Sequence, residues 1–367
     1  MNHKPAPKYL QLKQEIMTWI QSGKLPEGHV LPSENTIAVQ FQLSRHTVRQ
    51  TFAQLEQEGW IERKHGKGTY VTYPHHHHSV FQKVRTIGML TTSISDYIFP
   101  NIVRGAEAAL RNRGYQLLLS STDNDKDKER EAIHMMSTQA IQGLIIEPTK
   151  SAEGNPNYAF FQLLHKKNIP FLMINEKYPE LDCPFIKVDD EKGGFLATEY
   201  LIQLGHTEIA GFFKTDDLQG LHRLDGFIRA HRLYGLNHES INIVRYTTEQ
   251  KWTKPYQQAK RMLQRTLKRP TAFVCYNDEL AVHLLEIVRQ LGVSIPQDLS
   301  MIGFDDSALA TATEVKLSTL THPKSELGRE AAIMLMDWIE GSNKDFSHQQ
   351  VIYTPKLMIR ESTRSLL

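Results

Sequence analysis

The chain has 367 residues, of which 40% are hydrophobic and 23% charged, and its formal net charge is +2. This length exceeds one ordinary hydrophobic core, so we expect two or three structural units, and the composition excludes a disordered or fibrous protein. The sequence has no signal-like apolar segment near its start and no apolar run close to the ~20 residues that span a bilayer, so we expect no membrane association and a cytoplasmic location.

The two cysteines, Cys183 and Cys275, fall in different predicted elements. Two separated cysteines are neither a disulfide framework nor a Cys-rich metal site. We therefore expect buried or half-buried free thiols in a reducing compartment.

Positive charge is concentrated at the start of the chain. Residues 1–73 contain nine Lys and Arg against six Glu, so the rest of the chain is close to neutral. A small basic unit beside a large neutral one fits nucleic-acid binding at one end only, although many small domains carry a similar surplus.

Apolar spacing predicts three helices in residues 1–73. A helix over 8–22 has its stripe at Leu12, Ile16, Trp19 and Ile20, and Gly23 ends it. Ser33 is predicted to cap a second helix and Ser44 a third. Residues that fall off the apolar stripe of the third helix point outward, and they are Arg45, His46, Arg49 and Gln50.

Two short helices joined by a tight turn, the second opening with outward Arg and His, are typical of a helix-turn-helix whose second helix enters the major groove. Arg pairs with guanine edges, whereas Thr47 suits a phosphate. Gly59 then ends the third helix, and WIERK and TYVTY are predicted to be two strands around His65-Gly66-Lys67-Gly68. These strands form a wing, in which glycine allows close approach to a groove. Each basic residue taken alone is more often a solvated surface charge, but the combination favours DNA binding.

The segments YLQLKQEI, LPSE, SRHTVR and HGKGTYV resemble the GntR-type winged-helix family over nearly all of residues 4–73. The resemblance implies contacts with double-stranded operator DNA from the turn before the second helix, from the third helix and from the wing tip. Together with the outward His46, the candidate DNA-binding residues are Ser33, Glu34, Arg45, His46, Thr47, Arg49, His65, Gly66 and Lys67.

Four consecutive histidines, residues 75–78, follow Pro74. Imidazoles bind zinc or nickel, but four adjacent ones lack the fixed geometry of a structural site. We interpret residues 74–84 as a His-rich linker and expect no metal site.

From residue 85 onward, apolar runs alternate with amphipathic helical segments. Continuous apolar strands between helices predict a parallel sheet covered on both faces, and the number of strands favours two similar α/β lobes. The predicted strands are residues 86–91, 115–121, 143–148, 170–175, 185–189, 209–213, 243–247, 271–277 and 301–306. Ligands of such sheets bind outside the carboxyl ends of the strands, so two facing lobes would enclose a cleft.

Polar residues follow these strands: Glu147, Asn175, Asp189, Asn277-Asp278 and Asp305-Asp306. Arg223 is predicted to open the helix after the sixth strand, and His322 to lie on the return segment. Carboxylates, amides and an Arg beside the aromatic Tyr97 and Phe99 suit a polyhydroxylated ligand. The alternative for each Asp and Asn is that it merely caps the following helix.

Residues 85–365 resemble the sugar-binding domain of LacI/GalR-type repressors, through GLIIEP, VDDEKGGFLATEYLIQLGH, HRLDGF, CYNDELA, PQDLSMIGFDDS and LSTLTHPKSELGREAA. The resemblance implies a two-lobed type I periplasmic-binding-protein-like domain over residues 85–367, which binds the effector and dimerises. Its inducer-facing positions are Glu147, Asn175, Arg223, Asn277, Asp305 and His322, to which we add Tyr97 and Phe99, with Lys150 and Lys177 as neighbours.

LacI/GalR-type repressors normally carry their own helix-turn-helix and hinge helix, which this sequence lacks. A GntR-type winged helix on a LacI/GalR-type receptor resembles the arabinose-responsive repressors of Gram-positive bacteria. The resemblance implies a repressor that leaves its operator when L-arabinose or a related sugar closes the cleft. We expect a homodimer, because one small domain makes few DNA contacts and two half-sites add affinity.

Two other functions remain. A paired-carboxylate glycosidase would use the same acidic residues but would not explain a DNA-binding unit, and the sequence has no P-loop, GxSxG, HExxH or GxGxxG motif, so we expect neither catalysis nor a cofactor. A transport-type sugar receptor would not bind duplex DNA.

Overall fold

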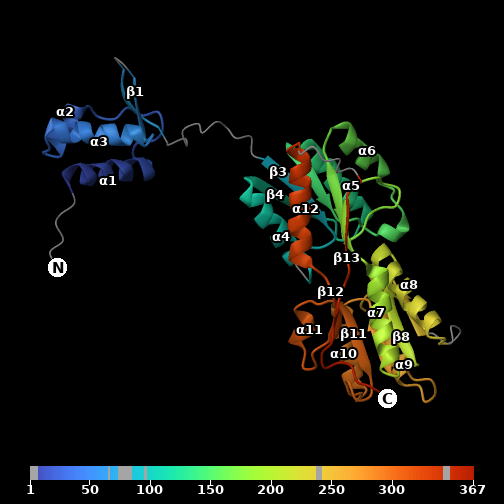
Figure 1. The fold of residues 1–367 in the computed structure, drawn as a ribbon. Coiled ribbons are helices and arrows are strands. Elements are labelled where there is room, and N and C mark those ends of the chain that lie inside the picture. The colour runs from blue at the N-terminus through green and yellow to red at the C-terminus, as the bar shows by residue number, and fades with distance from the viewer. Residues whose placement is uncertain (1–6, 65–66, 73–84, 95–96, 237–241, 342–347) are drawn as a thin grey trace. The chain divides into compact units, whose positions relative to one another are not determined.

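A computed structural model describes residues 7–64, 67–72, 85–94, 97–236, 242–341 and 348–367. The chain divides into two compact units, Met1–Lys83 and Val84–Leu367, which are described separately (Figure 1). Among the described helices, none has the length and apolar character needed to cross a bilayer.

The first unit has three helices and a two-stranded sheet, as predicted. Its elements are α1 (Lys8–Gln21), α2 (Glu34–Gln40), α3 (Arg45–Gln57), β1 (Ile61–Lys64) and β2 (Gly68–Val71). The predicted stripe of α1 is buried, and it packs on Ile37 of α2 and on Val48 and Phe52 of α3. Both predicted caps form: the Ser33 Oγ accepts from the Thr36 N–H at 3.2 Å, and the Ser44 Oγ from the Thr47 N–H at 3.1 Å.

The second unit consists of two lobes, each a six-stranded sheet between helices (Figure 1). The sheet of the N-lobe has the order β13-β7-β6-β5-β3-β4, and all of its neighbouring pairs are parallel. Its strands are β3 (Arg85–Thr91), β4 (Tyr115–Ser121), β5 (Ile141–Ile146), β6 (Phe171–Ile174), β7 (Phe185–Val188) and β13 (Gln350–Tyr353). The helices of this lobe are α4 (Phe99–Asn112), α5 (Lys126–Thr138), α6 (Tyr158–Lys166) and α12 (Lys324–Ile339), with a short η1 (Ser151–Glu153).

The sheet of the C-lobe has the order β14-β12-β11-β10-β8-β9 and is parallel except for the edge strand β14. Its strands are β8 (Ile209–Lys214), β9 (Asn242–Tyr246), β10 (Ala272–Cys275), β11 (Ser300–Asp305), β12 (Ser318–Thr321) and β14 (Leu357–Met358). The helices are α7 (Asp190–Gln203), α8 (Leu218–Leu233), α9 (Lys254–Leu263), α10 (Asp278–Gln290) and α11 (Leu309–Ala312), with η3 (Thr248–Gln250).

Each sheet has a hydrophobic cluster on both faces, which explains its continuous apolar strands. In the N-lobe, α4 and α12 cover one face and α5 and α6 the other. In the C-lobe, α7 and α8 cover one face and α9 and α10 the other. Cys183 and Cys275 are free and buried in these clusters, as expected.

The chain passes between the lobes three times: from β7 to α7, from β12 to α12, and from β13 to β14. All nine strands predicted after residue 85 are present, and the fold class is confirmed. The strands β12, β13 and β14 were missed. Three of the four residues of β12 are Ser or Thr, β13 alternates exposed and half-buried residues, and β14 has two residues, so they lack the continuous apolar run that identified the others.

Candidate functional site

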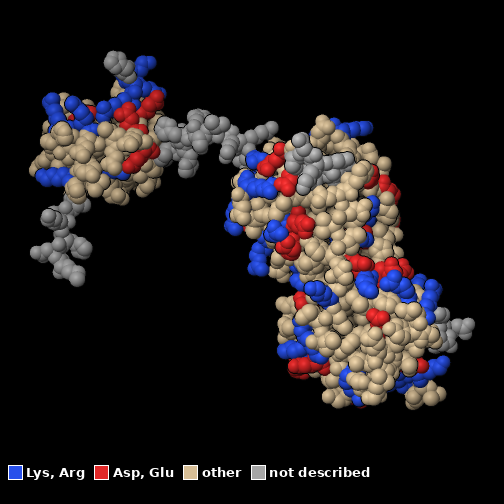
Figure 2. Space-filling view, in the orientation of Figure 1, with Lys and Arg blue, Asp and Glu red and all other residues tan. Residues whose placement is uncertain are grey.

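The exposed side of α3 carries the predicted outward residues. The side chains of Arg45, His46 and Arg49 are exposed, and Thr47 is half-buried with its Oγ1 2.8 Å from the Ser44 Oγ. Figure 2 shows Lys and Arg side chains along the side of this unit that carries α2, α3 and the β1–β2 hairpin. The start of α3 thus presents two arginines on one surface, as binding to a phosphate backbone and base edges requires.

Glu34 connects three elements of this surface. Its carboxylate lies 3.4 Å from the Arg49 Nε on α3 and 3.3 Å from the Arg63 guanidinium on β1. The Arg49 side chain remains 69% exposed, so this ion pair orients it without burying it. Arg63 was not among the candidates, although its place in the strand before the wing is visible in the sequence.

The wing is an antiparallel hairpin in which Ile61 pairs with Val71 and Lys64 with Gly68. An isolated bridge from Val30 to Tyr70 adds a third backbone partner. Lys67 is exposed at the tip, and its N–H donates to the Lys64 carbonyl at 2.9 Å. The other two tip candidates, His65 and Gly66, lie outside the described residues, as do the four histidines of the linker.

A cavity of about 320 Å³ lies between the two lobes of the second unit. In the N-lobe it adjoins the ends of β3 and β5, and in the C-lobe those of β8 and β10. In each sheet these two strands are neighbours between which the strand order reverses, since the strand following the first lies on its other side. Parallel sheets bind ligands at such reversal points, because the loops diverge and leave a crevice. Here two crevices face each other.

The candidate effector residues divide into two groups. Six line the cavity, namely Tyr97, Phe99, Glu147, Arg223, Asn277 and Asp305. Asn175 and His322 do not line it; they lie behind Glu147, 1% and 4% exposed. Their side chains are therefore not at the cavity surface. The resemblance to LacI/GalR-type repressors placed them with the other effector residues and did not distinguish the two groups.

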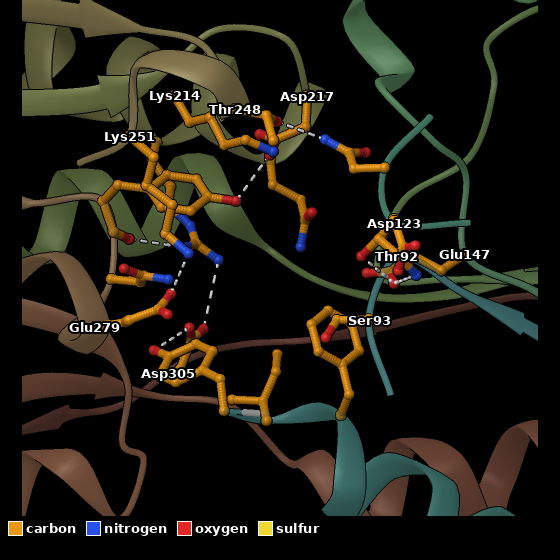
Figure 3. Close-up of a pocket in the computed structure, with 18 of the residues that line it drawn as sticks. Thr92, Ser93, Asp123, Glu147, Lys214, Asp217, Thr248, Lys251, Glu279 and Asp305 are labelled. Carbon is orange, nitrogen blue, oxygen red and sulfur yellow. Dashed lines mark hydrogen bonds and ion pairs between the residues drawn. The ribbon is translucent and has the colours of Figure 1, made fainter. Parts of the chain in front are cut away.

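Glu147 provides the N-lobe side with a buried carboxyl group (Figure 3). Its Oε2 accepts from the Thr92 N–H at 2.9 Å and from the Thr92 hydroxyl at 2.8 Å, and its Oε1 accepts from the Asn175 amide at 2.7 Å. Burial raises the pKa of Glu147, and the bonds from Thr92 and Asn175 partly oppose that rise.

His322 continues this chain of hydrogen bonds. Its Nε2 lies 3.2 Å from the Asn175 Oδ1, which can only accept, so Nε2 carries the proton. Burial lowers the pKa of His322 to about 4, so the ring is neutral. Its Nδ1 has no hydrogen-bond partner among the described residues. His322 stands on the crossover from β12 to α12 and connects that hinge to Glu147.

Arg223 joins the C-lobe side of the cavity. It lies in the second turn of α8 rather than at the helix start, because Asp217 is the N-cap. Its Nε donates to the Asp190 Oδ1 at 2.7 Å, and its second nitrogen lies 3.6 Å from the Asp305 Oδ1. Burial alone lowers the pKa of Arg223, but Asp190 and Asp305 outweigh it and keep the group charged.

The aromatic ring of Phe304 lies 3.6 Å from the Arg223 guanidinium carbon, and the ring of Tyr276 lies 4.7 Å from it. The Arg223 guanidinium also donates to the Tyr276 carbonyl at 2.7 Å. A planar cation held between two rings and two carboxylates has one available orientation, which fixes the donors that a ligand meets.

Tyr97 links the lobes. Its backbone φ is +60°, a left-handed value, and its hydroxyl lies 2.6 Å from the Asp305 Oδ2 and 3.0 Å from the Phe304 carbonyl. The Asp278 N–H donates to the same hydroxyl at 3.2 Å. Burial, followed by Asp305 and Asp278, raises the pKa of Tyr97, so the hydroxyl keeps its proton and donates it.

The helix-capping alternative also holds at two positions. Asn277 caps α10 by accepting from the Leu280 N–H at 2.9 Å, and Asp189 caps α7 by accepting from the Lys192 N–H at 2.9 Å. Asn277 also lines the cavity, and its amide nitrogen takes no part in the cap, which uses Oδ1. The neighbouring candidates Lys150 and Lys177 do not line it.

Sequence reasoning missed most of the C-lobe lining. The additional polar residues are Lys214, Asp217, Gln219, Tyr246, Thr248, Lys251, Tyr276 and Glu279, and the N-lobe adds Thr92, Ser93, Asp123 and Asn124 (Figure 3). Most of them lie within a few positions of a strand end, so a search of the sequence for polar residues after each predicted strand would have identified them.

Each cation that lines the cavity is paired with a carboxylate. Lys214 lies 2.9 Å from Asp217, Lys251 lies 2.6 Å from Glu279, and Arg223 contacts Asp190 and Asp305. The lining residues that the structure describes thus hold no surplus positive charge with which to attract an anionic ligand. The alternating donors and acceptors of the cavity match a neutral polyhydroxylated molecule.

Both units of the chain match known protein families. Residues 8–71 match the bacterial regulatory proteins of the gntR family, and residues 198–363 match a periplasmic binding protein-like domain. Two relatives are called arabinose metabolism transcriptional repressors. One, from Geobacillus stearothermophilus, is 55% identical over the full length of both chains; the other, from Halalkalibacterium halodurans, is 44% identical over 97% of this chain and 96% of its own.

Among solved structures, a LacI family transcriptional regulator from Enterococcus faecium with bound ribose has a TM-score of 0.67 and 26% sequence identity. The match covers 77% of this chain and the whole of that one.

Proposed function

The chain belongs to the arabinose metabolism transcriptional repressors, and on that premise we propose that L-arabinose is the effector that binds its interlobe cavity and releases it from operator DNA. The observation that carries the proposal is the cavity, whose three lining cations are each compensated by a carboxylate. A neutral pentose satisfies these groups through its hydroxyls, whereas a sugar phosphate would bring a charge with no free cation to receive it.

In this proposal Glu147 and Asp305 accept hydrogen bonds from sugar hydroxyls, Arg223 and Asn277 donate them, and Phe99 packs on the sugar C–H groups. The Asp305 Oδ1 is buried without a hydrogen-bond partner among the described residues, so an acceptor is available there. Asn175 and His322 hold Glu147 in place. A site with fixed polar partners discriminates strongly against an epimer, because a misplaced hydroxyl leaves a buried group unpaired.

We further propose that Ser33, Glu34, Arg45, His46, Thr47, Arg49, His65, Gly66 and Lys67 contact the operator, and that two copies of the chain bind an inverted repeat. One small winged helix makes few contacts, whereas two half-sites add affinity and fix their own spacing. The sugar binds more tightly to the closed cleft and releases the DNA by shifting the dimer away from its operator-bound geometry. A coupling of about 1–3 kcal/mol weakens DNA binding about 5–150-fold.

Two experiments test the proposal. Calorimetric titration of the full-length chain with L-arabinose, D-xylose, D-ribose, D-galactose and L-arabinose 5-phosphate is expected to show binding of L-arabinose alone or by a wide margin. Tighter binding of another neutral sugar would replace the effector, and tighter binding of the phosphate would refute the argument from charge.

The second experiment selects duplexes from a random DNA library with the full-length chain. The selected sequence is expected to be an inverted repeat, and its complex to dissociate as L-arabinose is added, measured by fluorescence anisotropy. A single half-site, or a complex that survives saturating sugar, would contradict the proposed dimer or the proposed release.

A further inference from the structure

Beside the cavity, two segments of the N-lobe contact the C-lobe directly. The Asn124 amide donates to the Thr248 Oγ1 at 2.6 Å, and the Lys150 ammonium lies 2.7 Å from the Glu249 carboxylate. The Ser151 Oγ accepts a hydrogen bond of 2.9 Å from the N–H of Leu218, which is the first residue of α8. A backbone bond of 3.3 Å from the Ala152 N–H to the Asp216 carbonyl lies alongside.

The N-lobe side of these contacts is rigid. The buried Glu129 carboxylate accepts from the Thr149 N–H at 3.1 Å, from the Tyr178 hydroxyl at 2.7 Å and from the Asn157 amide at 2.8 Å. The Lys150 N–H then donates to the Asn124 Oδ1 at 3.0 Å. Hydrogen bonds within the N-lobe therefore hold the segment that carries Lys150 and Ser151 in place, independently of its contacts with the C-lobe.

The C-lobe side is fixed as well. The Asp216 Oδ2 accepts from the Thr248 N–H at 2.8 Å and from the Thr248 hydroxyl at 2.6 Å. Because that hydroxyl proton is used within the C-lobe, the oxygen can only accept from Asn124. The direction of each bond is thus set, and the two surfaces are complementary in only one relative position.

We propose that Asn124, Lys150 and Ser151 of the N-lobe, with Thr248, Glu249 and the Leu218 N–H of the C-lobe, form an interlobe clasp that sets the effector affinity by stabilising the closed cleft. Three of these residues, Lys150, Ser151 and Glu249, do not line the cavity. They act as positioning residues. A ligand that binds the closed cleft has an apparent affinity proportional to the fraction of molecules already closed. The clasp raises the fraction of closed molecules. The inference rests on the proposed function at one point, namely that the effector binds the closed form.

The clasp explains a feature of α8. The first N–H groups of a helix lack partners within it, and Asp217 provides for one of them by accepting from the Gly220 N–H at 2.7 Å. Ser151 provides for another from the opposite lobe. When the cleft opens, the Leu218 N–H loses the Ser151 Oγ as its acceptor. This N–H group of the C-lobe therefore favours the closed cleft.

The test variant is Ser151→Ala with Glu249→Ala, since both side chains lie outside the cavity. The matched control is Ser137→Ala with Glu191→Ala. Ser137 is 5% exposed against 3% for Ser151, and Glu191 pairs with Arg229 at 3.0 Å within the C-lobe. The control thus removes a similar hydroxyl and a similar exposed ion pair without touching the lobe contact.

The decisive measurement needs no sugar. Spin labels are attached to cysteines introduced at Lys166 on α6 and Lys260 on α9, two exposed positions on opposite lobes, and the native cysteines are buried. In the sugar-free protein, the clasp variant is expected to lose the short interlobe distances that the parent and the control both populate. Identical distance distributions in all three proteins would overturn the clasp.

Calorimetric titration with L-arabinose then measures the effect of the clasp on effector affinity. The Kd of the clasp variant is expected to rise about tenfold over the parent, the combined weight of one hydrogen bond and one exposed ion pair, while the control stays within about twofold. Equal affinities would refute the effect on binding. If the parent itself does not bind L-arabinose, the proposed effector is wrong, whereas the sugar-free distances still decide the clasp.

Discussion

Arg223 lines the cavity, where we propose that it contacts the effector, and its buried ion pairs also stabilise the fold. It is 3% exposed, yet it keeps its charge because Asp190 and Asp305 surround it. Truncation to Ala would leave those two carboxylates uncompensated in the interior, at a cost of about 3–5 kcal/mol, and would confuse loss of function with unfolding.

Arg223→Lys is therefore the sharper test of the cavity. Lysine keeps the charge but loses the planar stack on Phe304 and the second donor. We expect the Kd for L-arabinose to rise at least about tenfold, or about 1.4 kcal/mol, while operator affinity without sugar stays unchanged. Calorimetry and anisotropy measure the two constants, and a variant that remains fully inducible would show that Arg223 is outside the effector site.

Asp278 gives a prediction for pH. Burial, and after it the neighbouring Asp305, raise the pKa of Asp278 from its ordinary 3.8 to about 7. The folded state therefore holds a proton that the unfolded chain has lost. The stability that this proton provides is complete below about pH 4 and disappears as the pH rises through about 7.

Asp278→Asn removes this titration, and an amide can still serve both the Ser307 N–H and the Thr319 hydroxyl that the carboxyl group contacts. Relative to the parent, the variant is expected to gain stability by up to about 1.4 kcal/mol per pH unit between pH 4 and 7, and no more above about pH 8. Urea unfolding at several pH values measures the difference, and parallel stability curves for the two proteins would disprove the raised pKa.

At the scale of elements, the residues that hold α3 in place are different from those that point outward from it. Ser44 fixes the start of α3 by a cap, so that the outward arginines project from a helix whose position is set by Val48 and Phe52 in the core. The functional side chains thus add little to the stability of the element that presents them. Their removal is expected to affect binding alone.

Arg49→Ala tests this at the winged helix. Arg49 is 69% exposed and its pair with Glu34 is long, so its loss changes the unfolding free energy by less than about 0.5 kcal/mol. Operator affinity is expected to fall at least about tenfold, with the affinity for L-arabinose unchanged, as anisotropy and calorimetry can show. Lys13→Ala, which breaks the pair with Glu58 on another side of the unit, is the control. A parallel loss of DNA and sugar binding would refute the separation of the two sites.

At the scale of the whole molecule, the two units have separate cores. We expect units with separate cores to melt independently, so calorimetric scanning is expected to show two transitions. L-arabinose at 100 times its Kd stabilises the second unit by about 2.7 kcal/mol and is expected to raise that transition alone, by roughly 5–10 °C. A single transition, or an equal shift of both, would show that the units fold as one.

The sequence alone determined the elements that depend on local pattern. The helical stripe of residues 8–22, the Ser33 and Ser44 caps and the nine apolar strands were all predicted, because periodicity and cap chemistry act within a few residues. The order of strands and helices, with polar residues after the strands, was enough to indicate an interlobe cavity and six of its lining residues. The short strands β12 to β14 were missed, since their pairing, not their composition, makes them strands.

Only the tertiary structure decided which polar residues reach the cavity. Asn175 and Glu147 both follow strands, yet Glu147 lines the cavity and Asn175 lies behind it, because β5 borders the point where the strand order reverses and β6 lies one strand further from it. The pairing of Arg223 with Asp190 depends on how α8 packs against α7, and that of Ser151 with Leu218 on how the two lobes face each other across three crossovers. Residue type and local spacing determine what a side chain can do, whereas the packing of distant segments decides which partners it meets.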